Sequence, residues 1–157
     1  MNFLEQLAAE WYEYKGCFVR TNIKYGKNPS GQGGYIGEFD VVAYSPETKE
    51  LIHIECSTDS STWEDREVRF KRKFSTAKDN YKKIFTFPYK KLERIAIVGF
   101  HKANNKPDFG PNVKIILIPD FVKEITNELK KKSPMQDAIP ESYSLLRAIQ
   151  YSAFFNK

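Results

Sequence analysis

The sequence predicts an α/β fold in which helices flank a mixed sheet. Two observations carry this prediction. Short runs rich in β-branched and aromatic residues, typical of strands, alternate with longer stretches whose apolar residues recur every three or four positions. Their order is helix, three strands, helix, strand, strand, helix, helix, which suits an α/β sandwich. The chain of 157 residues shows no internal repeat and no linker, so we expect a single domain.

The first half of the chain is expected to form one helix followed by three strands. Residues 2–15 carry an apolar stripe at helical spacing, and the glycine that follows is a common helix stop. The three strands are expected at residues 17–25, 35–44 and 51–56, connected by a Gly/Asn/Ser-rich loop at 26–34 and a turn at 45–49. The short turn makes the second and third strands antiparallel. The apolar run in the middle of the second strand indicates burial on both faces.

The second half is expected to combine three helices with two further strands. A long helix with an apolar stripe is expected over residues 63–85. Strands at 94–100 and 113–118 follow, then a helix over 119–132 and a last helix after Pro140.

Positive charge is concentrated in one part of the chain. The whole chain carries a net charge of +5 and has a pI near 9.1. The segment 66–94 contains eleven Lys/Arg and three Asp/Glu residues, a net +8, so the remainder carries −3. A basic segment beside an acidic remainder indicates a polyanionic partner such as nucleic acid, although a basic helix can also be simply a solvated surface.

The composition also argues against several classes of protein. No run approaches about 18 apolar residues, and the N-terminus lacks a basic region followed by an apolar one, so we expect neither a membrane span nor a signal peptide. The only two cysteines, Cys17 and Cys56, lie in apolar surroundings and indicate reduced thiols in a cytoplasmic protein. A zinc site is not expected, because the cysteines and the two histidines, His53 and His101, lack the close spacing of zinc ligands.

Two acidic residues, Asp40 and Glu55, stand at comparable places on the second and third strands, so they can meet at one end of the hairpin. Two carboxylates held together need a neutralising partner. Mg²⁺ or Mn²⁺ is the usual one, and the backbone carbonyl of Cys56 offers a further oxygen. Such a site suits phosphodiester hydrolysis. The simpler alternatives are a surface Asp40 at a strand end and a solvent-facing Glu55, since His53 and Glu55 alternate with isoleucines.

Four segments resemble, in the right order, the PD-(D/E)XK nuclease superfamily, and most closely its restriction-endonuclease-like and Holliday-junction-resolvase-like members. These segments are Glu5 and residues 16–19, 37–44 and 51–57. The resemblance covers roughly residues 3–100. It implies a restriction-endonuclease-like α-β-β-β-α-β core with a mixed central sheet. Residues 101–157 would then be a C-terminal strand-helix-helix extension of the same domain.

The resemblance implies roles for three acids. Asp40 and Glu55 would bind the metal, and Glu5 would reach the metal site from the first helix, often through water. Glu5 also has a simpler explanation, because a glutamate in the first turn of a helix is favoured by capping and by the helix dipole. Glu10 is the competing acid of this helix, but Glu5 has the family's spacing to the glycine that ends it.

Ser57 departs from the family pattern, which has a lysine at this position. That lysine orients the attacking water and stabilises the charge that develops in the transition state, which a serine hydroxyl cannot do. We expect the cation to come instead from the helix over 63–85, where Lys73 and Arg66 lie at the border of the apolar stripe. Lys73 is preferred, because a lysine stem can lie along apolar surface. The alternatives are that Lys73 is an ordinary surface residue and that the site has lost catalysis.

Binding of nucleic acid is expected to rely on basic side chains that contact phosphates. The candidates are Lys24, Lys27, Arg66, Lys71, Arg72 and Lys83. The loop between Lys24 and Tyr35, which also contains Asn28 and Gln32, is the best candidate for contacting DNA.

The expected function is therefore a Mg²⁺- or Mn²⁺-dependent nuclease that acts on DNA. Two alternatives stay open. In the first, the same fold binds nucleic acid without cleaving it, as a binding domain or accessory subunit. In the second, the chain is an interaction module or homodimer that uses the aromatic residues of its last helix. Those residues are Tyr143, Tyr151, Phe154 and Phe155.

Overall fold

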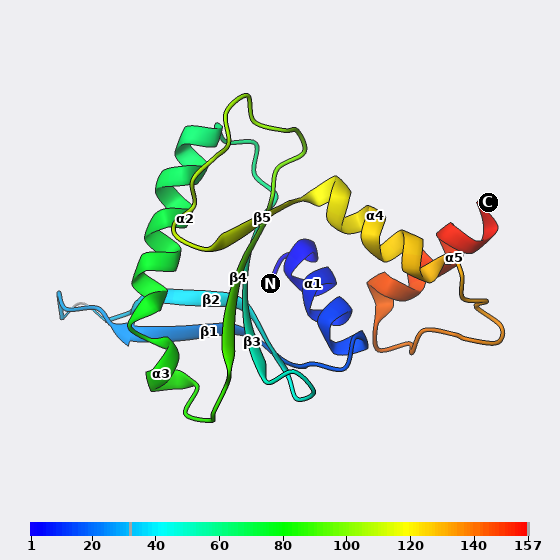
Figure 1. The fold of residues 1–157 in the computed structure, drawn as a ribbon, viewed down its shortest axis with the longest axis horizontal. Coiled ribbons are helices and arrows are strands. Elements are labelled where there is room, and N and C mark those ends of the chain that lie inside the picture. The colour runs from blue at the N-terminus through cyan, green and yellow to red at the C-terminus, as the bar shows by residue number, and fades with distance from the viewer. Residues whose placement is uncertain (32, 157) are drawn as a thin grey trace.

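A computed structural model describes residues 1–31 and 33–156, and it shows a sheet between two layers of helices (Figure 1). The helices are α1 (Phe3–Tyr14), α2 (Trp63–Lys78), α3 (Tyr81–Ile84), α4 (Ile118–Leu129) and α5 (Ser144–Phe155). The strands are β1 (Phe18–Lys27), β2 (Tyr35–Ser45), β3 (Glu50–Ser57), β4 (Lys91–Val98) and β5 (Val113–Leu117). The predicted α/β class and mixed sheet are confirmed, with α3 as an additional element.

In the described part of the chain, the five strands form one sheet in the order β1-β2-β3-β4-β5. β1, β2 and β3 are antiparallel neighbours, whereas β4 runs parallel to β3 and β5 parallel to β4. Parallel neighbours need a long crossover connection, and α2 with α3 provides it between β3 and β4. This crossover lays α2 over the end of β3 that carries Glu55.

Helices cover both faces of the sheet. α2 and α3 lie on one face, α1 and α4 lie on the other, and α5 packs against α1 and α4 (Figure 1). On the α1 face, Val41 of β2 and Ile54 of β3 pack with the apolar stripe predicted for the first helix. On the opposite face, Phe39 and Val42 pack with residues of α2 and α3. The central strands are therefore buried on both faces, as the apolar run in β2 predicts.

The single helix expected over residues 63–85 is divided into α2 and α3. α2 ends at Lys78, and the side chain of Asn80 donates a hydrogen bond of 3.0 Å to the carbonyl of Thr76. Short polar side chains compete with the helical backbone in this way and favour helix ends. The chain restarts as α3, and Tyr81 at its start is buried against the sheet.

Several other boundaries differ from the prediction; β1, for example, continues to Lys27, two residues into the loop expected at 26–34. The strand expected at 94–100 both begins and ends earlier, as Lys91–Val98. Gly99 follows it with a φ of 66°, a left-handed conformation that glycine adopts without penalty and that ends the strand. The helix expected over 119–132 spans Ile118–Leu129.

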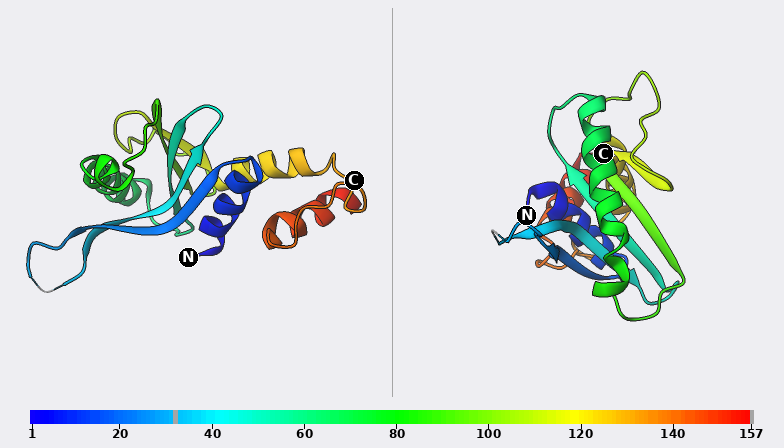
Figure 2. Two further views of the ribbon diagram at one scale, coloured as in Figure 1. Left: turned by 90° about the horizontal axis from the view of Figure 1, so that it is seen from below. Right: turned by 90° about the vertical axis from the view of Figure 1, so that its left-hand side faces the viewer.

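β1 and β2 continue beyond the rest of the sheet as a two-stranded arm. β2 pairs with β3 only from Val41 onward, but with β1 as far as the pair of Lys27 with Tyr35. The arm projects away from the helices (Figure 2, left). Within it, Tyr25 lies over its cross-strand partner Gly37, where an added Cβ would collide with the tyrosine hydroxyl. Glycine at this position therefore lets the ring cover the backbone of the arm.

Cys17 and Cys56 are both free thiols, the first half-buried and the second buried. None of the helices in the described residues combines the length and apolar character needed to cross a bilayer. On α5, Tyr151 and Phe155 are 42% and 59% exposed, and self-association through this helix stays a prediction.

Candidate functional site

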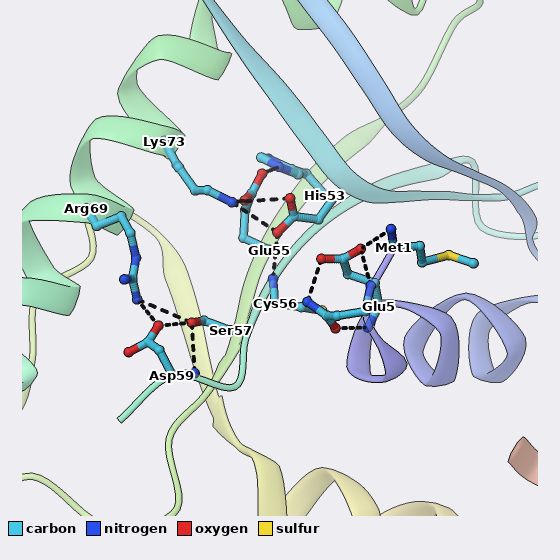
Figure 3. Close-up of polar contacts among 11 residues, drawn as sticks. Met1, Glu5, His53, Glu55, Cys56, Ser57, Asp59, Arg69 and Lys73 are labelled. Atoms are coloured by element: carbon cyan, nitrogen blue, oxygen red, sulfur yellow. Dashed lines mark hydrogen bonds and ion pairs between the residues drawn. The ribbon is translucent and has the colours of Figure 1, made fainter. Parts of the chain in front are cut away.

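Asp40, Glu55 and Lys73 meet between the sheet and α2, although they come from three different elements. The Lys73 ammonium donates a hydrogen bond of 3.0 Å to Oδ2 of Asp40 and also contacts Oε2 of Glu55 (Figure 3). The register pairs Val41 with Ile54, so Asp40 and Glu55, one residue further, are neighbours across the two strands. The two acids therefore lie at one end of the hairpin, and α2 supplies the cation, as the sequence predicts.

An irregularity in the β1–β2 ladder turns Phe39 towards α2, the side that Asp40 and Val42 face by the normal alternation of a strand. Asn22, which lies opposite Asp40, has a φ of 53°. This left-handed conformation is uncommon outside glycine, and asparagine is among the residues that tolerate it best. Phe39 packs on the α2 and α3 side, although Val41, two residues later, packs on the α1 side. The consecutive residues Phe39 and Asp40 therefore both face α2, which breaks the usual alternation of a strand.

Burial controls the charges of this site. Asp40 is 7% and Glu55 1% exposed. Burial and the charge of Glu55 raise the pKa of Asp40 to about 6, and burial raises the pKa of Glu55 against the opposing charge of Lys73. Burial lowers the pKa of Lys73, but the charges of Glu55 and Asp40 outweigh it and raise that pKa above its usual value. Two carboxylates therefore share one ammonium, which leaves room for a proton or a further cation.

The donor set fits a hard divalent cation. Besides the two carboxylates, the backbone of Cys56 faces the site, because its N–H donates a hydrogen bond of 3.0 Å to Oδ2 of Asp40. The N–H and C=O of one strand residue point to the same side, so the Cys56 carbonyl also faces this edge. Within residues 1–31 and 33–156, no three His, Cys, Asp or Glu side chains gather into a metal site. A cation here would therefore keep several waters, as Mg²⁺ usually does in proteins.

A fully buried histidine holds the second oxygen of Glu55. Nε2 of His53 lies 2.6 Å from Oε1 of Glu55, and Nδ1 lies 2.6 Å from the hydroxyl of Tyr81. The rings of Phe39, Phe74 and Tyr81 enclose the imidazole. Burial lowers the pKa of His53 to about 3, so the ring is neutral at pH 7. The alternative in which His53 and Glu55 face solvent is therefore wrong.

A separate polar cluster surrounds Ser57, where the family has its lysine. The Ser57 hydroxyl donates to the Asp59 carboxylate, which the Arg69 guanidinium also contacts (Figure 3). Burial raises the pKa of Asp59, but hydrogen bonds from Ser57 and Ser61 and the charge of Arg69 outweigh it and lower that pKa. Arg69 precedes Lys73 by one helical turn, so α2 presents two cations to this end of β3.

Glu5 is engaged in capping α1. Its carboxylate accepts hydrogen bonds from the backbone N–H of Asn2 at 3.0 Å and from the Asn2 side chain at 2.7 Å, which completes a capping box. Among the described residues, Glu5 has no hydrogen bond or ion pair with Asp40, Glu55 or Lys73. It lies close to Cys56 (Figure 3), whose thiol pKa is raised by burial and by nearby charges that include Glu5. Capping is thus observed, and a role at the metal stays a prediction.

Arg66 is buried, which argues against its predicted contact with nucleic acid. It is 6% exposed, its guanidinium donates a hydrogen bond of 2.8 Å to the carbonyl of Asp59, and it stacks over the ring of Trp63. At the border of the apolar stripe of α2, the Arg66 side chain therefore points into the protein interior, where it links the helix to the segment after β3.

The other predicted contacts for nucleic acid are exposed. These are Lys24 and Lys27 on the arm and Lys71, Arg72 and Lys83 on α2 and α3. Lys71 also pairs with Asp108 at 2.8 Å. Gln32 lies outside the described residues.

The sequence-based prediction places Lys73 beside Glu55 but misses His53 and Tyr81 behind Glu55 and Arg69 in the cluster around Ser57. His53 has a detectable signal, because it precedes Glu55 by two residues and strand residues at that spacing share a face. Arg69 has a similar signal, since it precedes Lys73 by four residues on one helix. Tyr81 has no such signal in the sequence. Its hydroxyl contacts His53, 28 residues away, only because α2 ends and α3 begins at Tyr81.

Comparison with known proteins adds information about the fold. No protein-family model and no curated protein matches this chain. The crystal structure of AF1548, a protein of unknown function, matches with a TM-score of 0.50 at 14% sequence identity, over 96% of this chain and 95% of the other. At this identity the likeness concerns the fold alone, and the function has to be argued from the site.

Proposed function

We propose that the protein is a divalent-metal-dependent nuclease that hydrolyses phosphodiester bonds in DNA, on a restriction-endonuclease-like core. The observation that carries the proposal is the convergence of the half-buried Lys73 on the buried carboxylates of Asp40 and Glu55. Two carboxylates and a lysine are the side chains that the PD-(D/E)XK resemblance implies. The lysine here comes from α2 instead of the strand position held by Ser57.

Each of these side chains has a distinct role in the proposal. Asp40 and Glu55, with the Cys56 carbonyl, would hold Mg²⁺ or Mn²⁺, which when bound lowers the pKa of an attacking water and offsets charge on the phosphate. Lys73 stays protonated and keeps a positive charge where negative charge develops in the transition state. Hydrogen bonds and packing fix these groups before substrate arrives, so little reorganisation is needed during the reaction.

The surroundings of the site suit a polyanion. Asp40 lies at the base of the arm, whose exposed lysines are Lys24 and Lys27, and Lys73 lies on α2 beside the exposed Arg72. DNA that reaches the carboxylates would therefore pass basic side chains on both elements. Contacts of this kind bind phosphates without reading the base sequence.

Cleavage of DNA by matched variants tests the proposal. Wild type, Asp40→Asn and the control Glu47→Gln, an exposed acid in the β2–β3 turn, would be incubated with supercoiled, branched and single-stranded DNA. We expect cleavage with Mg²⁺ or Mn²⁺ in wild type and Glu47→Gln, and none in Asp40→Asn. Failure to cleave any of these substrates in either metal, or equal cleavage by Asp40→Asn, rejects the proposal.

Binding of nucleic acid without hydrolysis is the second candidate. The observation that favours it is that Lys73 already pairs with both carboxylates, while Ser57 replaces the lysine that the family uses. It predicts DNA binding that weakens steeply with salt and falls in Arg72→Glu, with no product in any metal.

A further inference from the structure

The two oxygens of Glu55 have different partners. Oε2 contacts the ammonium of Lys73, on the side where Asp40 also lies. Oε1 is bound from within the fold by Nε2 of His53, at 2.6 Å. A carboxylate has two equivalent oxygens and a broad torsion, so a fixed contact to one oxygen determines where the other points.

His53 itself cannot turn freely. Its side chain is 0% exposed, and both ring nitrogens are occupied, Nε2 by Glu55 and Nδ1 by the hydroxyl of Tyr81 at 2.6 Å. The ring centroids of Phe39 and Phe74 lie 4.8 Å and 5.1 Å from that of the imidazole, both edge-on. Rotation of the ring would break two hydrogen bonds in a place that water does not reach, and an unpaired buried polar atom is costly.

The chemistry of these side chains determines which group donates and which accepts in the hydrogen bonds that link Glu55, His53 and Tyr81. An ionised carboxylate only accepts, so Nε2 of His53 carries the proton that is donated to Glu55. A neutral imidazole has one N–H, so Nδ1 must accept, and the Tyr81 hydroxyl must donate to it. Tyr81 therefore selects the tautomer of His53 that can hold Glu55.

We propose that His53 and Tyr81 are positioning residues, whose hydrogen-bonded chain fixes Oε1 of Glu55 and presents Oε2 to the reaction site. This inference rests on the proposed nuclease function. The role follows the general behaviour of groups behind metal ligands, which orient the ligand and influence the affinity for the metal. This role also gives a function to the helix end that separates α2 from α3, since α3 starts at Tyr81 and places its hydroxyl against His53.

Nuclear magnetic resonance of the imidazole nitrogens tests the hydrogen-bond order without metal or substrate. The chain has only two histidines, and His101 is exposed and serves as the internal reference. We expect His53 to be a single Nε2–H tautomer at pH 7, with a proton that exchanges slowly with water. An Nδ1–H tautomer, or a mixture of tautomers like that of a free imidazole, overturns the inference.

The variant Tyr81→Phe removes the hydroxyl and keeps the ring. We expect its Mn²⁺ affinity, measured by isothermal titration calorimetry, to fall about ten- to hundred-fold. We also expect kcat to fall while KM for DNA stays unchanged, because His53 and Tyr81 are buried and have no surface to offer to DNA. The matched control is Tyr44→Phe, which makes the same change at the edge of the same apolar cluster, four residues from Asp40. Wild-type affinity and kcat in Tyr81→Phe overturn the inference.

Two substitutions of His53 separate positioning from packing. His53→Gln keeps an N–H donor near the place of Nε2, whereas His53→Leu fills similar space with no donor. We expect His53→Gln to bind Mn²⁺ more tightly than His53→Leu, and we expect Tyr81→Phe to have no further effect in the His53→Gln background. Equal Mn²⁺ affinity in both His53 variants overturns the inference. If the wild type neither binds Mn²⁺ nor cleaves DNA, the nuclease proposal itself fails; if it does both and Tyr81→Phe matches Tyr44→Phe, only this inference fails.

Discussion

The ammonium of Lys73 lies 3.0 Å from Oδ2 of Asp40, although the two residues are 33 positions apart and belong to a helix and a strand. In the nuclease family that the sequence resembles, the cation stands on the same strand as the second acid, two residues after it. Here that strand position carries Ser57, and the cation reaches the carboxylates from the helix packed above them. A site of this kind needs a positive charge beside the two carboxylates, and either the strand or the packed helix can supply it.

The first prediction concerns the source of that charge. We expect Lys73→Met to lower kcat for DNA cleavage by about a hundred- to thousand-fold, because a preorganised charge is removed from the transition state. Adding Ser57→Lys to Lys73→Met should restore part of the activity, since the new ammonium starts from the strand position that the family uses. Single-turnover cleavage assays measure both effects.

The control for Lys73 is Lys78→Met, which removes an exposed lysine from the last turn of the same helix. It should cleave DNA like the wild type. If Lys73→Met does so too, the helix does not supply the catalytic cation.

The second prediction concerns stability and pH in the absence of metal. The pKa of Asp40 is raised to about 6 in the folded state, chiefly by burial, against about 4 in an unfolded chain. The folded state therefore holds the Asp40 proton more tightly. The contribution of this group to stability is fully present below about pH 4 and is lost as the pH rises through about 6. Two pKa units correspond to about 2–3 kcal/mol between pH 4 and pH 7.

Asp40→Asn removes the pH-dependent contribution of this carboxyl group to stability, because the carboxamide does not titrate. Urea unfolding at a series of pH values gives the free energy of unfolding of both proteins. The wild type should lose stability relative to Asp40→Asn as the pH rises from 4 to 7. A difference between the two proteins that is independent of pH contradicts a raised pKa for Asp40.

The third prediction concerns the two-stranded arm. Lys24 and Lys27 are exposed on it, and β3 does not cover this part of β2. Lys24→Glu/Lys27→Glu should weaken DNA binding about equally for different sequences and reduce its dependence on salt, because phosphate contacts are lost. KM should rise with little change in kcat. The control Lys131→Glu, a charge reversal on an exposed lysine just after α4, should bind DNA nearly as the wild type does, which fluorescence anisotropy measures.

Local patterns predict the central features of the site, because each depends on spacing along one element. A turn of known length places Asp40 and Glu55 at one end of a hairpin, and helical periodicity puts Lys73 at the border of the apolar stripe. The same periodicity puts Arg66 at that border. Its actual burial depends on Trp63 and Asp59, which it contacts only once the helix is packed.

Local sequence patterns do not predict the features that tertiary packing determines. Helix propensities around Asn80 differ by only tenths of a kcal/mol, too little to predict a helix end there, so contacts with the sheet such as that of Tyr81 decide where the helix ends. The left-handed Asn22 accompanies the turn of Phe39 towards α2, yet asparagine adopts many other conformations elsewhere. The link from Glu55 through His53 to Tyr81 joins two elements whose relative placement no short pattern encodes.

The last prediction concerns Glu10, the acid of α1 that competes with Glu5 for a role at the metal. Glu10 is 5% exposed and accepts hydrogen bonds from the backbone N–H groups of Leu145 and Leu146, at 2.9 Å and 3.0 Å. It therefore caps the start of α5, whose own N-cap residue makes no side-chain hydrogen bond. Glu10→Ala leaves these amides without their acceptor, so we expect a loss of about 1–3 kcal/mol in the free energy of unfolding.

Hydrogen exchange locates the effect of Glu10→Ala within the fold. The amides of Leu145 and Leu146 should exchange much faster in the variant, whereas those of β3 should keep their protection relative to global unfolding. Glu13→Ala, which removes an exposed acid from the same helix, is the control and should leave both regions unchanged. DNA cleavage by Glu10→Ala should persist at temperatures where the protein is folded, because Glu10 binds α5 and not the carboxylate site. Unchanged exchange at Leu145 and Leu146 would contradict the capping role, and a selective loss of Mn²⁺ binding in the folded variant would place Glu10 in the metal site.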